Sequence, residues 1–270
     1  MKLQAAILDW AGTVVDHGSR APMGAFVRAF AEFGVSISIA DARGPMGMAK
    51  WDHIRTVGQA PAVAAAWRTR HGRDFNEADV DAIFQVFEPM NVAAVRDHAD
   101  LIPGAIEAIA ALRARGLRIG ATTGYTRAIM QELAPLAAAA GYAPDLTVCA
   151  GDLSAGRPSP LMMWYAMAKL GVWPAATVVK VDDTTPGIGE GTAAGTWTVG
   201  ITLTGNEVGL SAADLTALSD AERAAHRARA GAVLTAAGAD YVIDSIAELP
   251  AVVAAIDARL AAGERPIPRD

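Results

Sequence analysis

The sequence is poor in cysteine and has no long apolar run. Its 270 residues include a single cysteine, Cys149, so no disulfide can form within the chain, which fits a reducing compartment. No apolar run approaches the roughly 20 residues that a membrane span needs. The first apolar run, residues 5–8, stops at Asp9, unlike the longer apolar region of a signal peptide. These features predict a soluble, cytoplasmic protein without a membrane partner.

Basic residues are also scarce. The formal net charge is −6, whereas proteins that bind nucleic acid usually carry a basic excess, so nucleic acid is not an expected partner. A hydrophobic share of 52% excludes a disordered chain and is sufficient for a sizeable core. A catalytic amine has few candidates, because the chain contains only four lysines: Lys2, Lys50, Lys169 and Lys180.

Short apolar segments alternate with helical patterns in most of the chain. We expect strands at residues 3–8, 117–121, 146–149, 177–181, 197–201 and 241–243. Strands that alternate with helices predict an α/β fold with a doubly wound (Rossmann-like) parallel sheet covered on both faces.

One long stretch departs from this alternation. Residues 21–99 show helical apolar spacing and no strand pattern, which predicts an all-helical insertion. The remaining residues, 1–20 and 100–270, would form the α/β core domain. Within that core we interpret the alanine-rich residues 203–237 as surface helices.

Three of the expected strands end in unusual polar groups. These are Asp9-Trp10-Ala11-Gly12-Thr13, Thr122-Thr123-Gly124-Tyr125 and Asp182-Asp183-Thr184. Ligands of a doubly wound sheet bind beyond the carboxyl ends of its strands, so these loops should converge on one crevice. Separated carboxylates can hold Mg²⁺, a threonine with a glycine amide can bind phosphate, and a carboxylate can attack phosphorus. A single aspartate at a strand end is often only a turn or a helix cap, so the hypothesis depends on all three loops together.

The three loops resemble the motifs of the haloacid dehalogenase superfamily of phosphotransfer enzymes. The matching residues are Asp9-x-x-Gly12-Thr13, Thr123-Gly124 and Asp183-Thr184. The resemblance implies that Asp9 is the nucleophile and that residues 21–99 form a helical cap. The usual phosphatases of this superfamily carry a second aspartate two residues after the nucleophile, as general acid for an oxygen leaving group. Here that position is Ala11, which argues against an ordinary phosphate ester.

Further strings resemble the phosphonatase family within this superfamily. They are Gly44-Pro45-Met46-Gly47 with Lys50 and Asp52-His53, Thr123-Gly124-Tyr125-Thr126, and Gly156-Arg157-Pro158. The resemblance implies hydrolysis of the carbon–phosphorus bond of phosphonoacetaldehyde to acetaldehyde and phosphate. Lys50 would form a Schiff base with the aldehyde, and Asp9 would become an aspartyl-phosphate. The chemistry agrees, because a protonated imine accepts the electron pair of the broken bond and the leaving carbon needs no acid at Ala11.

The same resemblance implies roles for the other site residues. One Mg²⁺ per subunit would bind the Asp9 carboxylate, the Ala11 carbonyl and Asp183. The phosphoryl group would meet Thr123 and Arg157, and His53 would either shuttle protons or simply pack as a core histidine. Substrate binding is expected of Gly124, Tyr125, Met46 and Gly47. The family also implies a homodimer joined through the caps.

Several points remain open from the sequence. Asp182 could belong to the metal site or be a solvated neighbour, and Gly187 stands where the superfamily often has another acidic residue. Two alternative functions also remain: another Mg²⁺-dependent phosphatase of the superfamily acting on a small phosphate ester, and a non-catalytic phosphate-binding protein. Borohydride trapping of a lysine adduct would separate the first from a phosphonatase, and Mg²⁺-dependent phosphate release would exclude the second.

Overall fold

The computed structural model describes residues 1–266, and these residues contain a parallel sheet of six strands in the order β3-β2-β1-β4-β5-β6. The strands are β1 (Ala5–Leu8), β2 (Arg118–Thr126), β3 (Leu146–Ala150), β4 (Val178–Asp182), β5 (Trp197–Ile201) and β6 (Tyr241–Ile243). The strand order reverses direction at β1, between β2 and β4, as in a doubly wound fold. The predicted fold class is therefore confirmed.

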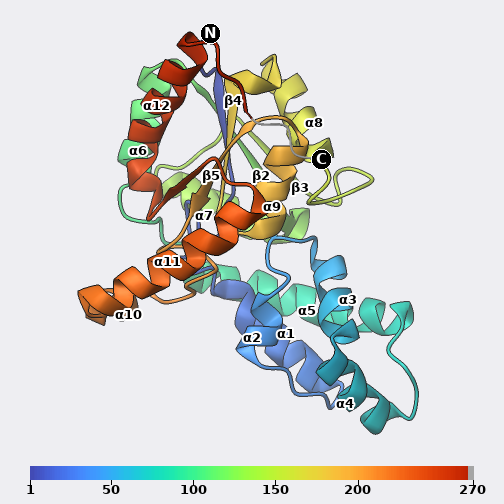
Figure 1. The fold of residues 1–270 in the computed structure, drawn as a ribbon. Helices are drawn as coiled ribbons and strands as arrows, with labels where there is room; N and C mark the ends of the chain where they lie inside the picture. The colour runs from blue at the N-terminus through green and yellow to red at the C-terminus, as the bar shows by residue number, and fades with distance from the viewer. Residues whose placement is uncertain (267–270) are drawn as a thin grey trace.

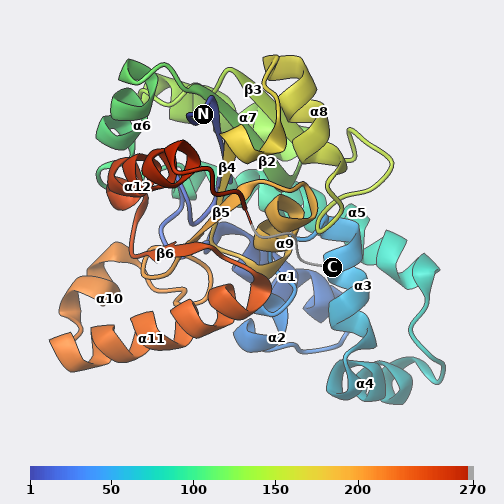
Figure 2. The same cartoon turned by 45° about the horizontal axis from the view of Figure 1, so that its top comes forward.

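Helices cover both faces of this sheet (Figure 1). Ala6 and Leu8 of β1 pack in a cluster with α6 (Ala105–Ala114), α7 (Arg127–Ala139) and α12 (Leu249–Ala261). Their neighbours Ala5 and Ile7 point to the other face, because side chains alternate along a strand, and pack with α8 (Leu161–Leu170). Three more helices complete the core: α9 (Thr185–Ala193), α10 (Ala212–Ala217) and α11 (Asp220–Ala237). Figure 2 shows α10 and α11 beside β6.

The inserted segment is helical throughout and has a hydrophobic cluster of its own, centred on residues such as Phe26, Ile54 and Phe87. Its elements are α1 (Ala21–Glu32), α2 (Ile39–Arg43), α3 (Lys50–Gln59), α4 (Pro61–His71), α5 (Glu77–Ala94) and the 3₁₀ turn η1 (Val95–His98). It lies at one end of the sheet, below the core in the view of Figure 1. Among the described helices, none combines the length and apolar character that crossing a bilayer requires.

Two details differ from the sequence predictions. Strand β2 does not end before Thr122 but continues to Thr126, with a register shift in its pairing with β3 between Thr123 and Thr126. Residues 203–210, expected to begin a run of surface helices, form a loop instead. Leu203 and Val208 of this loop are buried against α11, so its composition reflects core packing and not a helix surface.

Candidate active site

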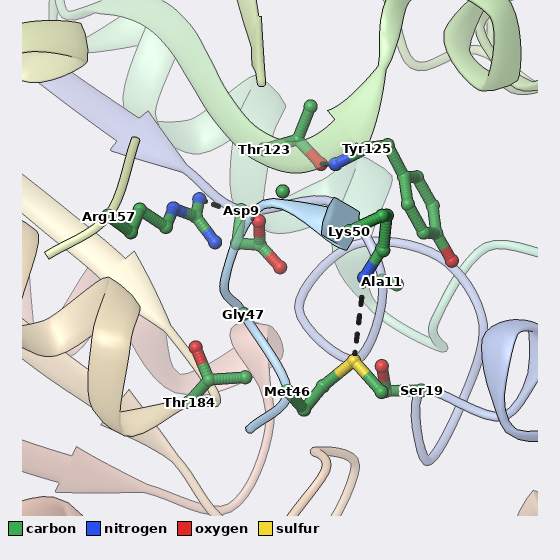
Figure 3. A pocket seen from close by; sticks show the side chains of 11 residues that line it. Asp9, Ala11, Ser19, Met46, Gly47, Lys50, Thr123, Tyr125, Arg157 and Thr184 are labelled. Carbon is green, nitrogen blue, oxygen red and sulfur yellow. Dashed lines mark hydrogen bonds and ion pairs between the residues drawn. The ribbon is translucent and has the colours of Figure 1, made fainter. Parts of the chain in front are cut away.

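A pocket lies between the carboxyl ends of the strands and the helical segment (Figure 3). It is lined by Asp9, Ala11, Ser19, Met46, Gly47, Lys50, Thr123, Gly124, Tyr125, Arg157 and Thr184. Nine of these eleven residues were predicted from the sequence, and Ser19 and Thr184 were not. Two predicted residues, Asp183 and His53, do not line the pocket.

Arg157 links the acidic groups at the base of the pocket. Its guanidinium is almost fully buried and donates from Nη2 to Asp9 Oδ1 at 2.8 Å and from Nε to Glu190 Oε2 at 3.1 Å. The same Nη2 lies 3.3 Å from Asp182 Oδ2. Burial alone would lower the pKa of Arg157, but Asp182, Asp9 and Glu190 outweigh it and raise the pKa. A permanent cation therefore faces Asp9. Burial raises the pKa of Asp9, and Arg157 opposes this shift.

A second buried cation, Lys180, stands behind Arg157. Its Nζ donates to Thr122 Oγ1 at 2.7 Å and lies 3.0 Å from Asp182 Oδ2 and 3.2 Å from Glu190 Oε2. In the sequence, Lys180 was only one of four candidates for a catalytic amine, and Glu190 was not predicted. A lone lysine in the apolar run of β4 was the signal that could have found this network, because a buried amine needs an acidic partner. Asp182, wholly buried here, is not a solvated residue.

The acidic residues at the strand ends fit a divalent cation. Asp9, Asp182 and Asp183 offer carboxylate oxygens that all lie within 4.8 Å of one another, and all three residues are buried. Burial, Asp9 and Asp182 together raise the pKa of Asp183 well above its ordinary value. Such a concentration of buried negative charge, with oxygen ligands only, is the environment that Mg²⁺ prefers. Asp183 is held by the Thr13 hydroxyl at 3.1 Å and by the Asn206 amide at 2.7 Å.

The position of Gly187 explains how a third carboxylate enters this cluster. A Cβ atom added at Gly187 would lie 2.0 Å from the carboxyl carbon of Asp182. The Asp182 side chain thus fills the space that a side chain at position 187 would need. Gly187 itself lies in the first turn of α9, where its amide donates to the hydroxyl of Thr184, the N-cap residue.

Lys50 enters the pocket from the helical segment and faces the core. It is the first residue of α3, is only 2% exposed, and its Nζ lies 3.8 Å from Met46 Sδ and 5.1 Å from the centre of the Tyr125 ring. Burial lowers the pKa of Lys50 to about 8, a shift that Asp9 opposes and Arg157 assists. A substantial fraction of this amine is therefore neutral near physiological pH, which nucleophilic attack requires.

His53 lies one helical turn after Lys50. It is fully buried, stacks on Phe26 with ring centres 3.9 Å apart, and its Nε2 donates to the Ala42 carbonyl at 2.7 Å. Burial and the nearby Lys50 lower its pKa well below the ordinary value, so the ring is neutral at pH 7. In this structure His53 supports the helix that carries Lys50, and its role as proton shuttle stays a prediction.

Two glycines let the helical segment approach the core. A Cβ atom at Gly47 would lie 2.2 Å from Thr184 Oγ1, and one at Gly124 would lie 2.6 Å from the Met48 carbonyl oxygen. Side chains at these positions would push the two parts of the chain apart. The predicted role of Gly47 and Gly124 in substrate binding thus depends on the close approach of the helical segment to the core at the pocket.

Comparison with known proteins agrees with this fold. Residues 3–195 match the family model of haloacid dehalogenase-like hydrolases. Relatives named phosphonoacetaldehyde hydrolase include one from Paraburkholderia phytofirmans, 53% identical over 98% of this chain and 99% of its own. Another, from Klebsiella pneumoniae, is 50% identical over 98% of this chain and 99% of its own. A crystal structure of a phosphonoacetaldehyde hydrolase-like protein from Oleispira antarctica superposes with a TM-score of 0.97 at 42% identity, covering 98% of this chain and 96% of that one.

The fold, the pocket and the family match define the class as haloacid dehalogenase-like hydrolases. At 53% identity over nearly the whole length, the chain belongs within that class to the phosphonoacetaldehyde hydrolase family.

Proposed function

We propose that this protein hydrolyses the carbon–phosphorus bond of phosphonoacetaldehyde, using a Schiff base on Lys50 and an aspartyl-phosphate on Asp9. The observation that carries the proposal is the placement of a buried lysine with a lowered pKa opposite a buried aspartate in one pocket (Figure 3). An amine is needed to activate the aldehyde and a carboxylate is needed to accept the phosphoryl group. The names of the relatives support the same substrate.

The first chemical step concerns the aldehyde. The neutral Lys50 amine attacks the carbonyl carbon, water leaves to give an imine, and the imine nitrogen takes up one proton. The ring of Tyr125 and the sulfur of Met46, both close to Nζ, exclude water from this end of the pocket. The imine then withdraws electrons from the neighbouring carbon that bears phosphorus.

The second step transfers the phosphoryl group. An Asp9 oxygen attacks phosphorus, the carbon–phosphorus bond breaks, and its electron pair moves into the imine to give an enamine. Protonation of the enamine carbon and hydrolysis of the imine release acetaldehyde and restore Lys50, and water hydrolyses the aspartyl-phosphate to phosphate. Arg157, 2.8 Å from Asp9, is placed to bind phosphoryl oxygens, and Thr123 lines the same wall.

We propose Mg²⁺ as the cofactor, held by Asp9, the Ala11 carbonyl and Asp183, with Asp182 beside them. When bound, the ion would neutralise charge on the phosphoryl oxygens and on the attacking carboxylate. Removal of the ion with a chelator should therefore abolish turnover, and added Mg²⁺ should restore it.

Ala11 separates this proposal from the phosphate-ester alternative. It lines the pocket two residues after Asp9, and its methyl group cannot protonate an oxygen leaving group. The test is release of acetaldehyde from phosphonoacetaldehyde, coupled to NADH oxidation by alcohol dehydrogenase, with a small phosphate ester assayed in parallel. We expect Mg²⁺-dependent acetaldehyde release and little ester hydrolysis. Efficient ester hydrolysis without acetaldehyde release would show that the phosphate-ester alternative is correct.

The organisation of the chain enters the same proposal. We propose that residues 21–99 act as a cap over a core made of residues 1–20 and 100–270, and that two copies join through their caps in the cytoplasm. The separate hydrophobic cluster of the helical segment supports the first part, and family resemblance supports the rest. Sedimentation equilibrium should give twice the chain mass of 27.9 kDa.

A further inference from the structure

Arg43 reaches out of the helical segment into the core. It is the last residue of α2, and its Nη1 donates to the carbonyl oxygens of Gly18 at 3.0 Å and Asn206 at 2.8 Å, and to Asn206 Oδ1 at 3.0 Å. Its Nη2 lies 3.5 Å from the Gly209 carbonyl oxygen. One guanidinium therefore joins three separate segments: the cap, the chain that leads into the cap, and the 203–210 loop of the core.

The surrounding backbone is shaped to receive this guanidinium. Gly209 has a φ of +68°, and a Cβ atom there would lie 2.4 Å from Arg43 Cζ. Gly18 has a φ of +84°, and a Cβ atom there would lie 2.3 Å from the Leu210 carbonyl oxygen. Glycine at both positions leaves the carbonyl groups free to turn toward Arg43, since left-handed backbone favours glycine.

The same loop holds an acidic residue of the proposed metal site. The Asn206 amide donates to Asp183 Oδ2 at 2.7 Å, and a Cβ atom at Gly205 would lie 2.5 Å from Asp183 Cβ. Thr204 Oγ1 also donates to the Gly12 carbonyl at 3.3 Å. Arg43 donates to the backbone carbonyl and to the side-chain oxygen of Asn206. The backbone amide of Asn206 in turn orients the Asp183 carboxylate.

We propose that Arg43 is a positioning residue that couples closure of the cap to the orientation of Asp183. With the cap closed, Arg43 holds the 203–210 loop and Asn206 fixes the carboxylate. When the cap moves away, the loop loses the guanidinium, which donates two short hydrogen bonds to Asn206, and Asp183 loses a firmly placed donor. The metal site is then complete only when substrate is enclosed. The catalytic consequence depends on the proposed function, whereas the effect on the loop does not.

The test compares Arg43→Met, which keeps the apolar stem, with Arg43→Lys, which keeps the charge but not the planar fork. Arg55→Met is the matched control, because Arg55 is an exposed cap arginine whose guanidinium lies over Trp51, 6.0 Å from the ring centre. Three quantities are measured: hydrogen–deuterium exchange of peptides covering 203–210, Mg²⁺ affinity by calorimetry with Mg²⁺ alone, and kcat and KM for phosphonoacetaldehyde.

We expect Arg43→Met to speed exchange in 203–210 and to weaken Mg²⁺ binding about ten-fold, the usual effect of losing an outer support of a metal ligand. Its kcat/KM should fall by a similar factor and recover in part at high Mg²⁺. Arg43→Lys should be intermediate, and Arg55→Met should match the wild type. If Arg43→Met proves unfolded, Gly209→Ala provides the second route, since its Cβ would displace the same guanidinium.

Unchanged exchange in 203–210 and unchanged Mg²⁺ affinity in folded Arg43→Met and Gly209→Ala would overturn the proposal, even if turnover falls. An equal loss in Arg55→Met would do the same, because it would show a general effect of the cap surface. A third outcome would contradict only the proposed function. In that case the wild type binds Mg²⁺ and Arg43→Met binds it more weakly, but the wild type releases no acetaldehyde.

Discussion

The pH at which Lys50 loses its proton decides whether the amine can act near neutrality. Burial lowers the pKa of this lysine from an ordinary 10.5 to about 8. At pH 7 an amine with the lower pKa is neutral in about one molecule in ten, against about one in 3,000 for the higher value. The protein environment thus raises the reactive fraction roughly 300-fold.

Two neighbouring charges shift the pKa of Lys50 in opposite directions, which allows a test. Asp9 raises the pKa of Lys50, so Asp9→Asn should move the titration to lower pH, while Arg157 lowers it, so Arg157→Met should move it to higher pH. The protein is incubated with acetaldehyde and borohydride across pH 6–11, and borohydride reduces the imine that forms on Lys50. The measurement is the initial rate at which the modified peptide appears, quantified by mass spectrometry. The neutral amine reacts, so the rate should rise with pH through a midpoint near 8.

Two outcomes would refute this reasoning. A wild-type midpoint near 10.5 would mean that burial does not lower the pKa of Lys50. A shift to higher pH in Asp9→Asn would mean that the carboxylate does not act on the amine through its charge. Either result would remove the electrostatic basis for a reactive lysine in this pocket.

Three further predictions follow from the site. Asp9→Asn should abolish turnover and leave the circular dichroism spectrum unchanged, because the amide is nearly isosteric but a poor nucleophile; near-normal turnover without deamidation would contradict the assignment. Ala11→Asp should lower turnover by orders of magnitude, since a like charge about 4 Å away costs roughly 4 kcal/mol at an effective dielectric of 20; unchanged turnover would show that position 11 does not act on the site. Lys50→Met should raise the free energy of unfolding at pH 7 by up to about 3 kcal/mol, because the folded state holds the Lys50 proton less tightly than the unfolded chain. This gain in unfolding free energy should shrink as pH rises from 8 to 10.5. An equal gain in urea titrations at pH 7 and at pH 10.5 would contradict the prediction.

Much of the sheet could be predicted because its strands are short apolar runs that end in polar loops. Asp9, Thr123 and Asp183 follow three such runs, and their convergence is a property of parallel sheets. Lys50 is different: nothing in its local sequence separates it from a solvated helix lysine, and only the family resemblance indicated it.

The sequence did not reveal contacts that form between distant segments. Glu190 lies inside a glycine-rich helix and becomes important only because Arg157 and Lys180 meet it, 33 and 10 residues away along the chain. The 203–210 loop was mistaken for helix, because its role depends on Asp183 and Arg43 and not on its own periodicity. Long-range polar contacts of this kind leave no repeating pattern in the sequence.

The most direct measurement of the central claim is borohydride trapping with phosphonoacetaldehyde, followed by peptide mapping, in the wild type and in Lys50→Arg. Arginine keeps the charge and the apolar stem but cannot form an imine. We predict one reduced adduct, on Lys50, in the wild type, and loss of both adduct and acetaldehyde release in Lys50→Arg, with vanadate binding retained. An adduct on Lys2, Lys169 or Lys180, or efficient cleavage by Lys50→Arg, would contradict the account.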